Sequence, residues 1–325
     1  MSDSPRYMQA INRALSDEMQ RDDRVILLGV DVGRPGGVYG VTEGLQERFG
    51  AGRVRDTPIA EMGVVGAATG AAMAGLRPVV EIMYMDFIGV CLDPIVNQAA
   101  KLPYMTGGGV RVPVVFRTQT GGGRSAGAQH SQSLEAVLAH FPGLKVFCPS
   151  DARDAYDLLV AAIRDDNPVC FVENRRLYSR RAEDADRAPQ PPGKARLVRS
   201  GDDLTVVTWG RMVSETLKAL EMLAGPGADA EVIDVRTLVP LDTALVSESV
   251  RRTGRLLVVH EAVESFGPGA ELVARLVEQT LWYLDGPVER YGALPSPVPY
   301  SPSLEREMLP GADGIAERIR HVATA

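Results

Sequence analysis

Short apolar segments alternate with helical segments along most of this chain, and this alternation constrains the fold more than any other feature. Buried parallel strands read as short runs of Val, Ile and Leu, and helices between them place apolar residues at a spacing of three or four. The predicted strands are residues 25–28, 79–83, 112–117, 145–148, 169–173, 204–208, 231–235, 256–260 and 288–291. The chain is therefore predicted to be α/β, with doubly wound, mainly parallel sheet covered by helices on both faces.

The alternation is interrupted once, near residues 186–199. This stretch is charged and contains a Pro-Gln-Pro-Pro-Gly run, a composition typical of a linker. A chain of 325 residues is also long for a single average domain. We predict one domain over residues 1–185, a linker over 186–199 and a second α/β domain over 200–325.

Composition excludes several classes of protein. The formal net charge is −7 and no basic cluster offsets it, so nucleic acid is not an expected partner. No run approaches the roughly 18 apolar residues of a membrane span. The three cysteines, Cys91, Cys148 and Cys170, lie in apolar runs without metal-ligand spacing, as reduced core residues do. These features predict a soluble, cytoplasmic protein that has no membrane or nucleic-acid partner.

Glu61 is the first candidate for chemistry. It follows a turn at residues 56–58 and precedes a helix of almost only small and apolar residues, 62–75. A glutamate at a helix start has an ordinary explanation, because the helix dipole favours an acid there. However, a helix without a polar face is suited to close approach by a ligand or another backbone. A carboxylate at its mouth would then be partly desolvated and suited to proton handling.

His130 is the second candidate, because it ends a glycine-rich loop that follows a predicted strand. Open α/β sheets bind ligands at the carboxyl ends of their strands, and a histidine there can act as acid or base near neutral pH. An ordinary loop histidine is the alternative. The loop also matches a weak dinucleotide pattern at Gly121, Gly123 and Ala126. That reading is disfavoured, because no helix follows directly and no acidic residue closes a second strand about 20 residues later.

A series of linked motifs then resembles one family over essentially the whole chain. The motifs are Ile-Ala-Glu-Met-Gly (59–63), Gly-Ala-Ala-Met-Ala-Gly-Leu-Arg-Pro (70–78), Asn-Gln-Ala-Ala-Lys (97–101), Gln-His-Ser-Gln-Ser (129–133), Pro-Gly-Leu-Lys-Val (142–146), Ile-Arg-Asp-Asp-Asn-Pro (163–168), Thr-Trp-Gly (208–210), Val-Ile-Asp-Val-Arg-Thr (232–237) and His-Glu (260–261). In this order they resemble the beta subunit of the E1 component of thiamine-diphosphate-dependent 2-oxoacid dehydrogenases. Residues 85–93 are most similar to the pyruvate and acetoin dehydrogenase branch.

The resemblance implies a fold and a set of roles. The first domain would be a transketolase-like pyrimidine-binding domain, and the second a transketolase-like C-terminal domain. Glu61 would hydrogen-bond N1′ of the cofactor aminopyrimidine and promote its imino tautomer. Phe87 would lie against the aminopyrimidine ring, and His130 would handle protons and help pass the acyl group to a lipoyl arm. The resemblance also implies a potassium site formed by Val114, Ala162, Ile163, Asp165 and Asn167, and oxygen ligands suit such a cation.

The family resemblance implies partners as well. A Gly-Asp-Gly motif followed by an asparagine holds the diphosphate through Mg²⁺ in thiamine diphosphate enzymes. The nearest string here is Gly-Ala-Asp-Gly at 311–314, and no asparagine follows it. The resemblance therefore implies that an E1 alpha subunit holds the diphosphate and Mg²⁺ in an α2β2 assembly. A lipoyl acyltransferase, the E2 component, would accept the acyl group from a small 2-oxo substrate.

Two alternatives to this function stay open. One is a two-subunit carboligase that transfers the activated aldehyde to a second carbonyl, and the other is a non-catalytic assembly subunit. Pro94, Pro103 and Val90 depart from the usual family residues near the substrate, so the sequence does not name the 2-oxo substrate.

Overall fold

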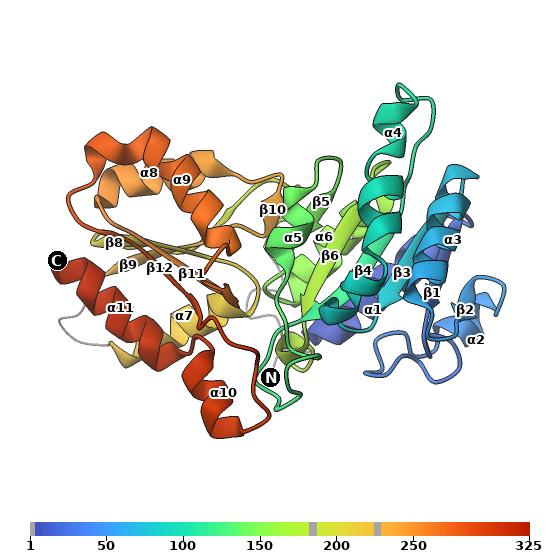
Figure 1. Ribbon diagram of the computed structural model, residues 1–325, viewed down its shortest axis with the longest axis horizontal. Helices are drawn as coiled ribbons and strands as arrows, with labels where there is room; N and C mark the ends of the chain where they lie inside the picture. The colour runs from blue at the N-terminus through green and yellow to red at the C-terminus, as the bar shows by residue number, and fades with distance from the viewer. Residues whose placement is uncertain (1–3, 182–186, 224–228) are drawn as a thin grey trace. The chain divides into compact units, whose positions relative to one another are not determined.

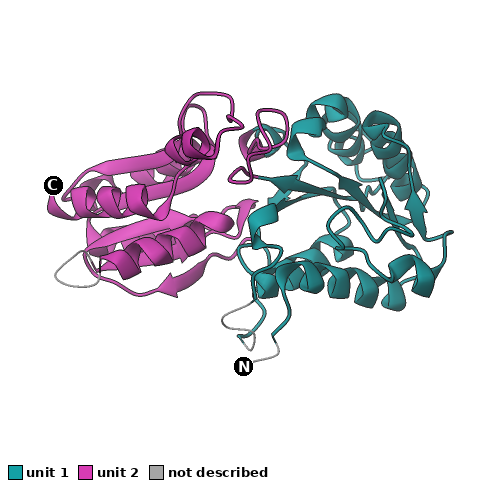
Figure 2. Cartoon of the chain, turned by 90° about the horizontal axis from the view of Figure 1, so that it is seen from below, with its two compact units in different colours: residues 1–120, 137–192 teal, residues 121–136, 193–325 magenta. Residues whose placement is uncertain are grey.

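The computed structural model describes residues 4–181, 187–223 and 229–325, which form two compact units (Figure 1). Unit 1 comprises residues 1–120 and 137–192, and unit 2 comprises residues 121–136 and 193–325 (Figure 2). Each unit has a mainly parallel sheet with helices, so the predicted α/β class is confirmed.

The strands of unit 1 lie in the order β5-β6-β4-β3-β1-β2, and all neighbours pair in parallel. Their bounds are β1 Val25–Gly29, β2 Val54–Asp56, β3 Arg77–Ile82, β4 Val115–Thr120, β5 Lys145–Phe147 and β6 Val169–Asn174. Because β1 lies between β2 and β3, the chain leaves β1 to one side and then crosses to the other. This arrangement is a doubly wound sheet.

The helical segments of unit 1 are α1 Tyr7–Arg21, α2 Leu45–Phe49, α3 Glu61–Met73, the short helices η1 Met85–Val90, η2 Pro94–Ala99 and η3 Arg175–Leu177, α4 Leu102–Met105, α6 Ala152–Arg164 and α5 Glu135–His140, whose first two residues belong to unit 2. Helices α1 and α6 pack on one face of the sheet and α3 on the other. Alternate strand residues face opposite sides, so Leu27 and Val79 pack in the core formed with α1 and α6. Val80 and Ile82 face the opposite side, towards α3.

The strands of unit 2 lie in the order β12-β11-β8-β9-β7, and only the pair of β7 with β9 is antiparallel. The bounds are β7 Arg196–Arg199, β8 Leu204–Thr208, β9 Ala230–Asp234, β10 Thr237–Val239, β11 Leu256–Val263 and β12 Val288–Ala293. The helices are α7 Arg211–Met222, α8 Thr243–Thr253, α9 Pro268–Thr280, η4 Leu281–Tyr283, α10 Pro302–Met308 and α11 Ala312–Thr324. Their core contains Leu204, Leu257 and Ile315.

Two elements differ from the sequence-based expectation. Strand β7, residues 196–199, lies inside the range predicted as a linker, whose residue 186 falls outside the described residues. This strand forms the edge of the sheet and Leu197 is half-exposed, so it lacks the apolar run of a buried strand. Strand β4 continues to Thr120 because residues 118–120 pair with β6, although the sequence predicted a loop from residue 118.

Candidate active site

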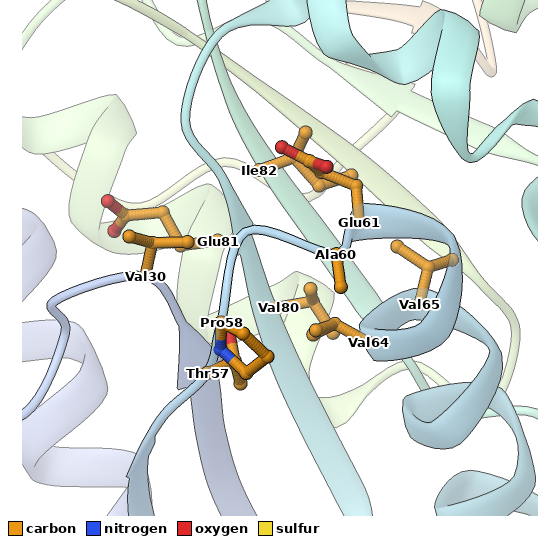
Figure 3. A pocket seen from close by; sticks show the side chains of 10 residues that line it. All are labelled: Val30, Thr57, Pro58, Ala60, Glu61, Val64, Val65, Val80, Glu81 and Ile82. Carbon is orange, nitrogen blue, oxygen red and sulfur yellow. The ribbon is translucent and has the colours of Figure 1, made fainter.

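Glu61 is the first residue of α3, at the carboxyl end of the sheet (Figure 3). Strand β2 ends at Asp56, and the Thr57 N–H donates to the Gly29 carbonyl at 2.9 Å, so a short turn brings the chain to the helix start. Ala60 supplies no side-chain cap, and the N–H groups of the first turn favour a negative charge at this end. Glu61 is half-buried, as expected for a partly desolvated acid.

Glu61 lines a small hollow whose other walls come from residues after β1 and β2 and from β3. The lining residues are Val30, Thr57, Pro58, Ala60, Glu61, Val64, Val65, Val80, Glu81 and Ile82. The chain crosses over β1 between β2 and β3, and such a switch point is where open α/β sheets bind ligands. The hollow encloses only about 10 Å³, enough for roughly one water molecule. A ligand larger than water would therefore lie mostly outside the hollow, with Glu61 at its edge.

A buried ionic cluster lies under this hollow. Arg117 on β4 donates from Nη1 to Glu81 Oε2 on β3 at 2.9 Å, and from Nε and Nη2 to the two Glu173 oxygens on β6 at 2.7 and 3.1 Å. The Tyr178 hydroxyl donates to Glu173 at 2.6 Å. Burial raises the pKa of Glu81, and Glu173 adds to the effect while Arg117 opposes it. Glu81 thereby supplies a second carboxyl group to the lining of the hollow, on the side of Val30 and turned away from Glu61 (Figure 3).

Phe87 lies in η1, the helical turn that follows β3. Its half-buried ring meets Tyr84 edge to face, with centroids 5.8 Å apart, and the Tyr84 hydroxyl lies 2.9 Å from that of Tyr39. Cys91, directly after η1, is close enough to Glu61 to respond to its charge. Burial, and then that charge, raise the pKa of the Cys91 thiol to about 12. Helices α3 and η1 also contact each other, so Glu61 and Phe87 lie on neighbouring elements of unit 1.

His130 lies in the other unit. The loop of residues 121–136 belongs to unit 2, together with the C-terminal part of the chain (Figure 2, magenta). His130 is half-buried, and its N–H donates to the Gly127 carbonyl at 3.3 Å. The sequence-predicted residues are therefore divided, with Glu61 and Phe87 carried by unit 1 and His130 by unit 2.

Backbone N–H groups at the start of this loop bind two carboxylates of unit 2. Gly122 donates to Glu261 on β11 at 3.0 Å, while Gly123 and Ser125 donate to the two oxygens of Glu305 on α10 at 2.7 and 2.9 Å. Glu305 is 3 % exposed. Sequence reasoning missed Glu305 and helix α10, although Ser-Pro at 301–302 is a helix-start signal.

His260 and Glu261, adjacent in one of the motifs, have different surroundings. His260 lies inside β11, stacks on Trp209 with ring centroids 5.5 Å apart, and has Nδ1 3.1 Å from the Ala262 carbonyl oxygen. Burial lowers its pKa to about 4, so the ring is neutral at physiological pH. Glu261 instead accepts from Arg211 Nε at 3.0 Å and from the Gly122 N–H. His260 serves packing, and Glu261 links the core of unit 2 to the His130 loop.

The five positions assigned to potassium lie at the end of α6, in the turn after it, and just before β4. The carbonyls of Ile163 and Asp165 both accept from the Arg77 guanidinium, at 2.7 Å each. The Val114 carbonyl accepts from the Val169 N–H at 3.0 Å, and Lys145 forms an ion pair with the Asp165 side chain. A carbonyl oxygen has a second lone pair, so these contacts leave acceptor capacity. The potassium site stays a prediction.

Among the residues that the structure describes, no group of three or more His, Cys, Asp or Glu side chains has the arrangement of a metal site. None of the helices described is long and apolar enough to cross a membrane. The three cysteines are buried and free, so their predicted position in the core is confirmed.

Comparison with known proteins agrees with this architecture. The model of the transketolase pyrimidine-binding domain matches residues 3–181, and that of the transketolase C-terminal domain matches residues 193–315. A solved structure titled as a split-gene transketolase, an inactive beta4 tetramer, has a TM-score of 0.79 and covers 99 % of both chains. At 23 % identity, this similarity concerns the fold. The fold and the switch-point site therefore define a transketolase-type protein.

Curated relatives narrow the class. The chain is 46 % identical to the mitochondrial pyruvate dehydrogenase E1 component subunit beta-1 of Arabidopsis thaliana, over 94 % of this chain and 86 % of the relative. It is also 46 % identical to the beta subunit of acetoin:2,6-dichlorophenolindophenol oxidoreductase of Cupriavidus necator, over 96 % and 95 %. The chain belongs to the family of pyruvate dehydrogenase E1 and acetoin dehydrogenase beta subunits.

Proposed function

We propose that this chain is the beta component of a two-subunit enzyme that uses thiamine diphosphate to decarboxylate a 2-oxoacid oxidatively or to cleave acetoin. The observation that carries the proposal is Glu61, a half-buried carboxylate at the start of α3 in an aliphatic hollow at the switch point of the sheet. Such a group can share a proton with a ring nitrogen of a ligand, because the aliphatic walls limit competition from water.

The residues of unit 1 fit the aminopyrimidine end of this cofactor. Glu61 would hold N1′ by sharing a proton, and Phe87 would supply an aromatic surface. When bound, thiamine diphosphate supplies a thiazolium carbon that adds to a carbonyl and stabilises the resulting carbanion. The work of this chain is to bind and orient the pyrimidine and to exclude water. His130 would hold or deliver a proton during acyl transfer to lipoamide.

An alpha subunit would complete the site. The hollow encloses only about 10 Å³ and has no basic residue in its lining, so the diphosphate needs another surface. The string at 311–314 does not match the diphosphate motif, because Ala312 separates Gly311 from Asp313 and no asparagine follows it. In the proposed assembly, α2β2, the alpha subunit holds the diphosphate and Mg²⁺, and potassium binds near Asp165.

Two substrates, pyruvate and acetoin, are candidates. The chain is 46 % identical both to a pyruvate dehydrogenase subunit and to an acetoin oxidoreductase subunit, so sequence identity does not distinguish them. A lipoyl acyltransferase is the proposed acceptor in both cases. Turnover of pyruvate and of acetoin by the α2β2 enzyme with 2,6-dichlorophenolindophenol distinguishes them.

Calorimetry tests the proposal directly. Titration of the isolated chain with thiamine diphosphate and Mg²⁺ should give weak binding or none, whereas the chain with its alpha subunit should bind in a Mg²⁺-dependent manner. Tight, Mg²⁺-dependent binding by the isolated chain would contradict the two-subunit site. Absence of binding by the complete α2β2 assembly would contradict the cofactor.

A further inference from the structure

We propose that Glu305 is the positioning residue that holds the loop carrying His130 in its working conformation. This inference rests on the role proposed for His130 and adds to it a residue that is distant in the sequence, 182 positions after Gly123. The loop, residues 121–136, and α10 both belong to that unit.

The contact between Glu305 and the loop uses both carboxylate oxygens. Oε1 accepts from the Gly123 N–H at 2.7 Å, and Oε2 accepts from the Ser125 N–H at 2.9 Å. The Glu305 side chain is buried, and hydrogen bonds to a buried charged group are stronger than those between neutral groups. Two N–H groups separated by one residue are thereby fixed to a single rigid group.

The loop requires such acceptors because of its backbone conformation. Gly121, Gly123 and Ser125 have φ of +93°, +84° and +54°. A positive φ at every second residue prevents this stretch from forming either a right-handed helix or a strand. Their N–H groups therefore need partners from elsewhere in the fold. A serine at positive φ is strained, and it persists here because Glu305 binds its N–H.

Side chains that flank Glu305 pack against the same loop. A Cβ atom on Gly122 would lie 2.7 Å from Leu309, and one on Gly127 would lie 2.2 Å from the ring of Tyr300. Gly127 also has φ +77° and accepts the hydrogen bond from the His130 N–H. The segment 300–309 thus contacts the loop from its glycines to the turn that presents His130.

Glu261 is a separate anchor with a different balance of contacts. One of its oxygens accepts from Gly122 and the other from Arg211, and it lies on β11, which has a neighbouring strand on each side. Glu305 gives both oxygens to the loop. A change at Glu305 is therefore expected to free residues 123–130 while leaving the core of unit 2 intact.

Hydrogen exchange measured by mass spectrometry on the α2β2 enzyme tests the anchor. In Glu305→Ala the amides of residues 121–136 should exchange at least about tenfold faster, because two charge-assisted bonds are lost. Glu305→Gln keeps one acceptor oxygen and should fall between Glu305→Ala and wild type. Glu307→Ala, an exposed residue of the same helix, is the matched control and should leave the loop unchanged. Exchange in Glu305→Ala equal to wild type would overturn the proposal.

Kinetics test whether Glu305 acts through His130. Turnover with a lipoyl-domain acceptor should fall about tenfold or more in Glu305→Ala, with a smaller loss when an artificial electron acceptor replaces lipoamide. The double variant Glu305→Ala/His130→Ala should be no slower than His130→Ala alone. Multiplied losses in the double variant would overturn the positioning role.

The hydrogen-exchange and kinetic experiments distinguish a failure of the anchor at Glu305 from a failure of the role proposed for His130. If His130→Ala turns over like wild type, the role proposed for His130 fails. Faster loop exchange in Glu305→Ala would still support Glu305 as the anchor of the loop, and unchanged exchange would still overturn it.

Discussion

Arg117 Nη1 lies 2.9 Å from Glu81 Oε2 in a pair whose side chains are 0 % and 3 % exposed. The two residues are register partners on β4 and β3, and Glu81 also lines the same hollow as Glu61. With Glu173 on the next strand, the cluster holds two carboxylates around one guanidinium. The wall of the candidate site therefore depends on a buried charge balance as well as on aliphatic packing.

Arg117→Met should destabilise unit 1 by about 3–5 kcal/mol, because it leaves two buried carboxyl groups without their cation. Urea denaturation followed by far-UV circular dichroism measures this loss. Tryptophan fluorescence would not report on unit 1, because both tryptophans, Trp209 and Trp282, lie in unit 2. Arg111→Met is the matched control, because Arg111 pairs with Asp166 while 75 % exposed and should cost less than about 1 kcal/mol. Equal losses in the two variants would mean that the buried cluster contributes little.

Glu61→Gln should leave assembly intact and slow exchange of the C2 hydrogen of bound thiamine diphosphate by about 10²–10⁴-fold. The amide preserves the shape of the side chain but cannot share a proton with N1′ in the same way. Exchange at C2 followed by proton NMR on the α2β2 enzyme measures the effect. A rate near wild type would return Glu61 to the role of an ordinary helix-start acid and favour a non-catalytic assembly subunit.

His130→Ala should act at a later step than Glu61→Gln. Cofactor binding and C2 exchange should persist, while turnover with the lipoyl acceptor should fall by about 10²-fold or more. An artificial electron acceptor should restore part of the rate, because it bypasses lipoamide. Collapse of cofactor binding would show that His130 has a structural role in the loop.

Glu135→Gln should make unit 2 more stable at about pH 8 and leave its stability nearly unchanged at about pH 4. Burial, and then the charge of Glu261, raise the pKa of Glu135 to about 7 from the ordinary value of 4.5. A raised pKa means that the folded chain binds the proton more tightly than the unfolded chain. The stabilisation is present below about pH 4.5 and is lost as the pH rises to about 7, by on the order of 3 kcal/mol.

Fluorescence of the buried Trp209 follows the unfolding of unit 2 for this comparison. Glu278→Gln, an exposed position on α9, is the control and should reproduce the pH dependence of wild type. If Glu135→Gln retains that dependence between about pH 4.5 and 7, another group is responsible.

Buried elements of this fold could be predicted from sequence because burial leaves a local signal. Strand β6 begins with the apolar run Val-Cys-Phe-Val, and the turn before Glu61 is visible as Asp-Thr-Pro. Strand β7 could not be found in this way, because an edge strand with half-exposed Leu197 needs no apolar run. Its pairing with β9 is a tertiary contact that the local sequence does not encode.

The site residues divide in the same way. Glu61, Phe87 and His130 are marked by motifs, whereas Glu305 acts on Gly123, which is 182 residues away in the sequence. Arg117 did leave a signal, since a charge within the apolar run 112–117 predicts a buried partner. Identifying Glu81 as that partner requires the register of β3 and β4.

The carboxylates that hold the glycine-rich run also decide which ligands that run can accept. Consecutive backbone N–H groups in such loops bind the phosphates of nucleotides in other proteins, because they form a concave patch of partial positive charge. Here Glu261 and Glu305 already occupy the N–H groups of Gly122, Gly123 and Ser125. A phosphate would have to displace two internal anions and face their charge. Despite its resemblance to a dinucleotide motif, this run is therefore closed to nucleotides by the protein's own acidic side chains.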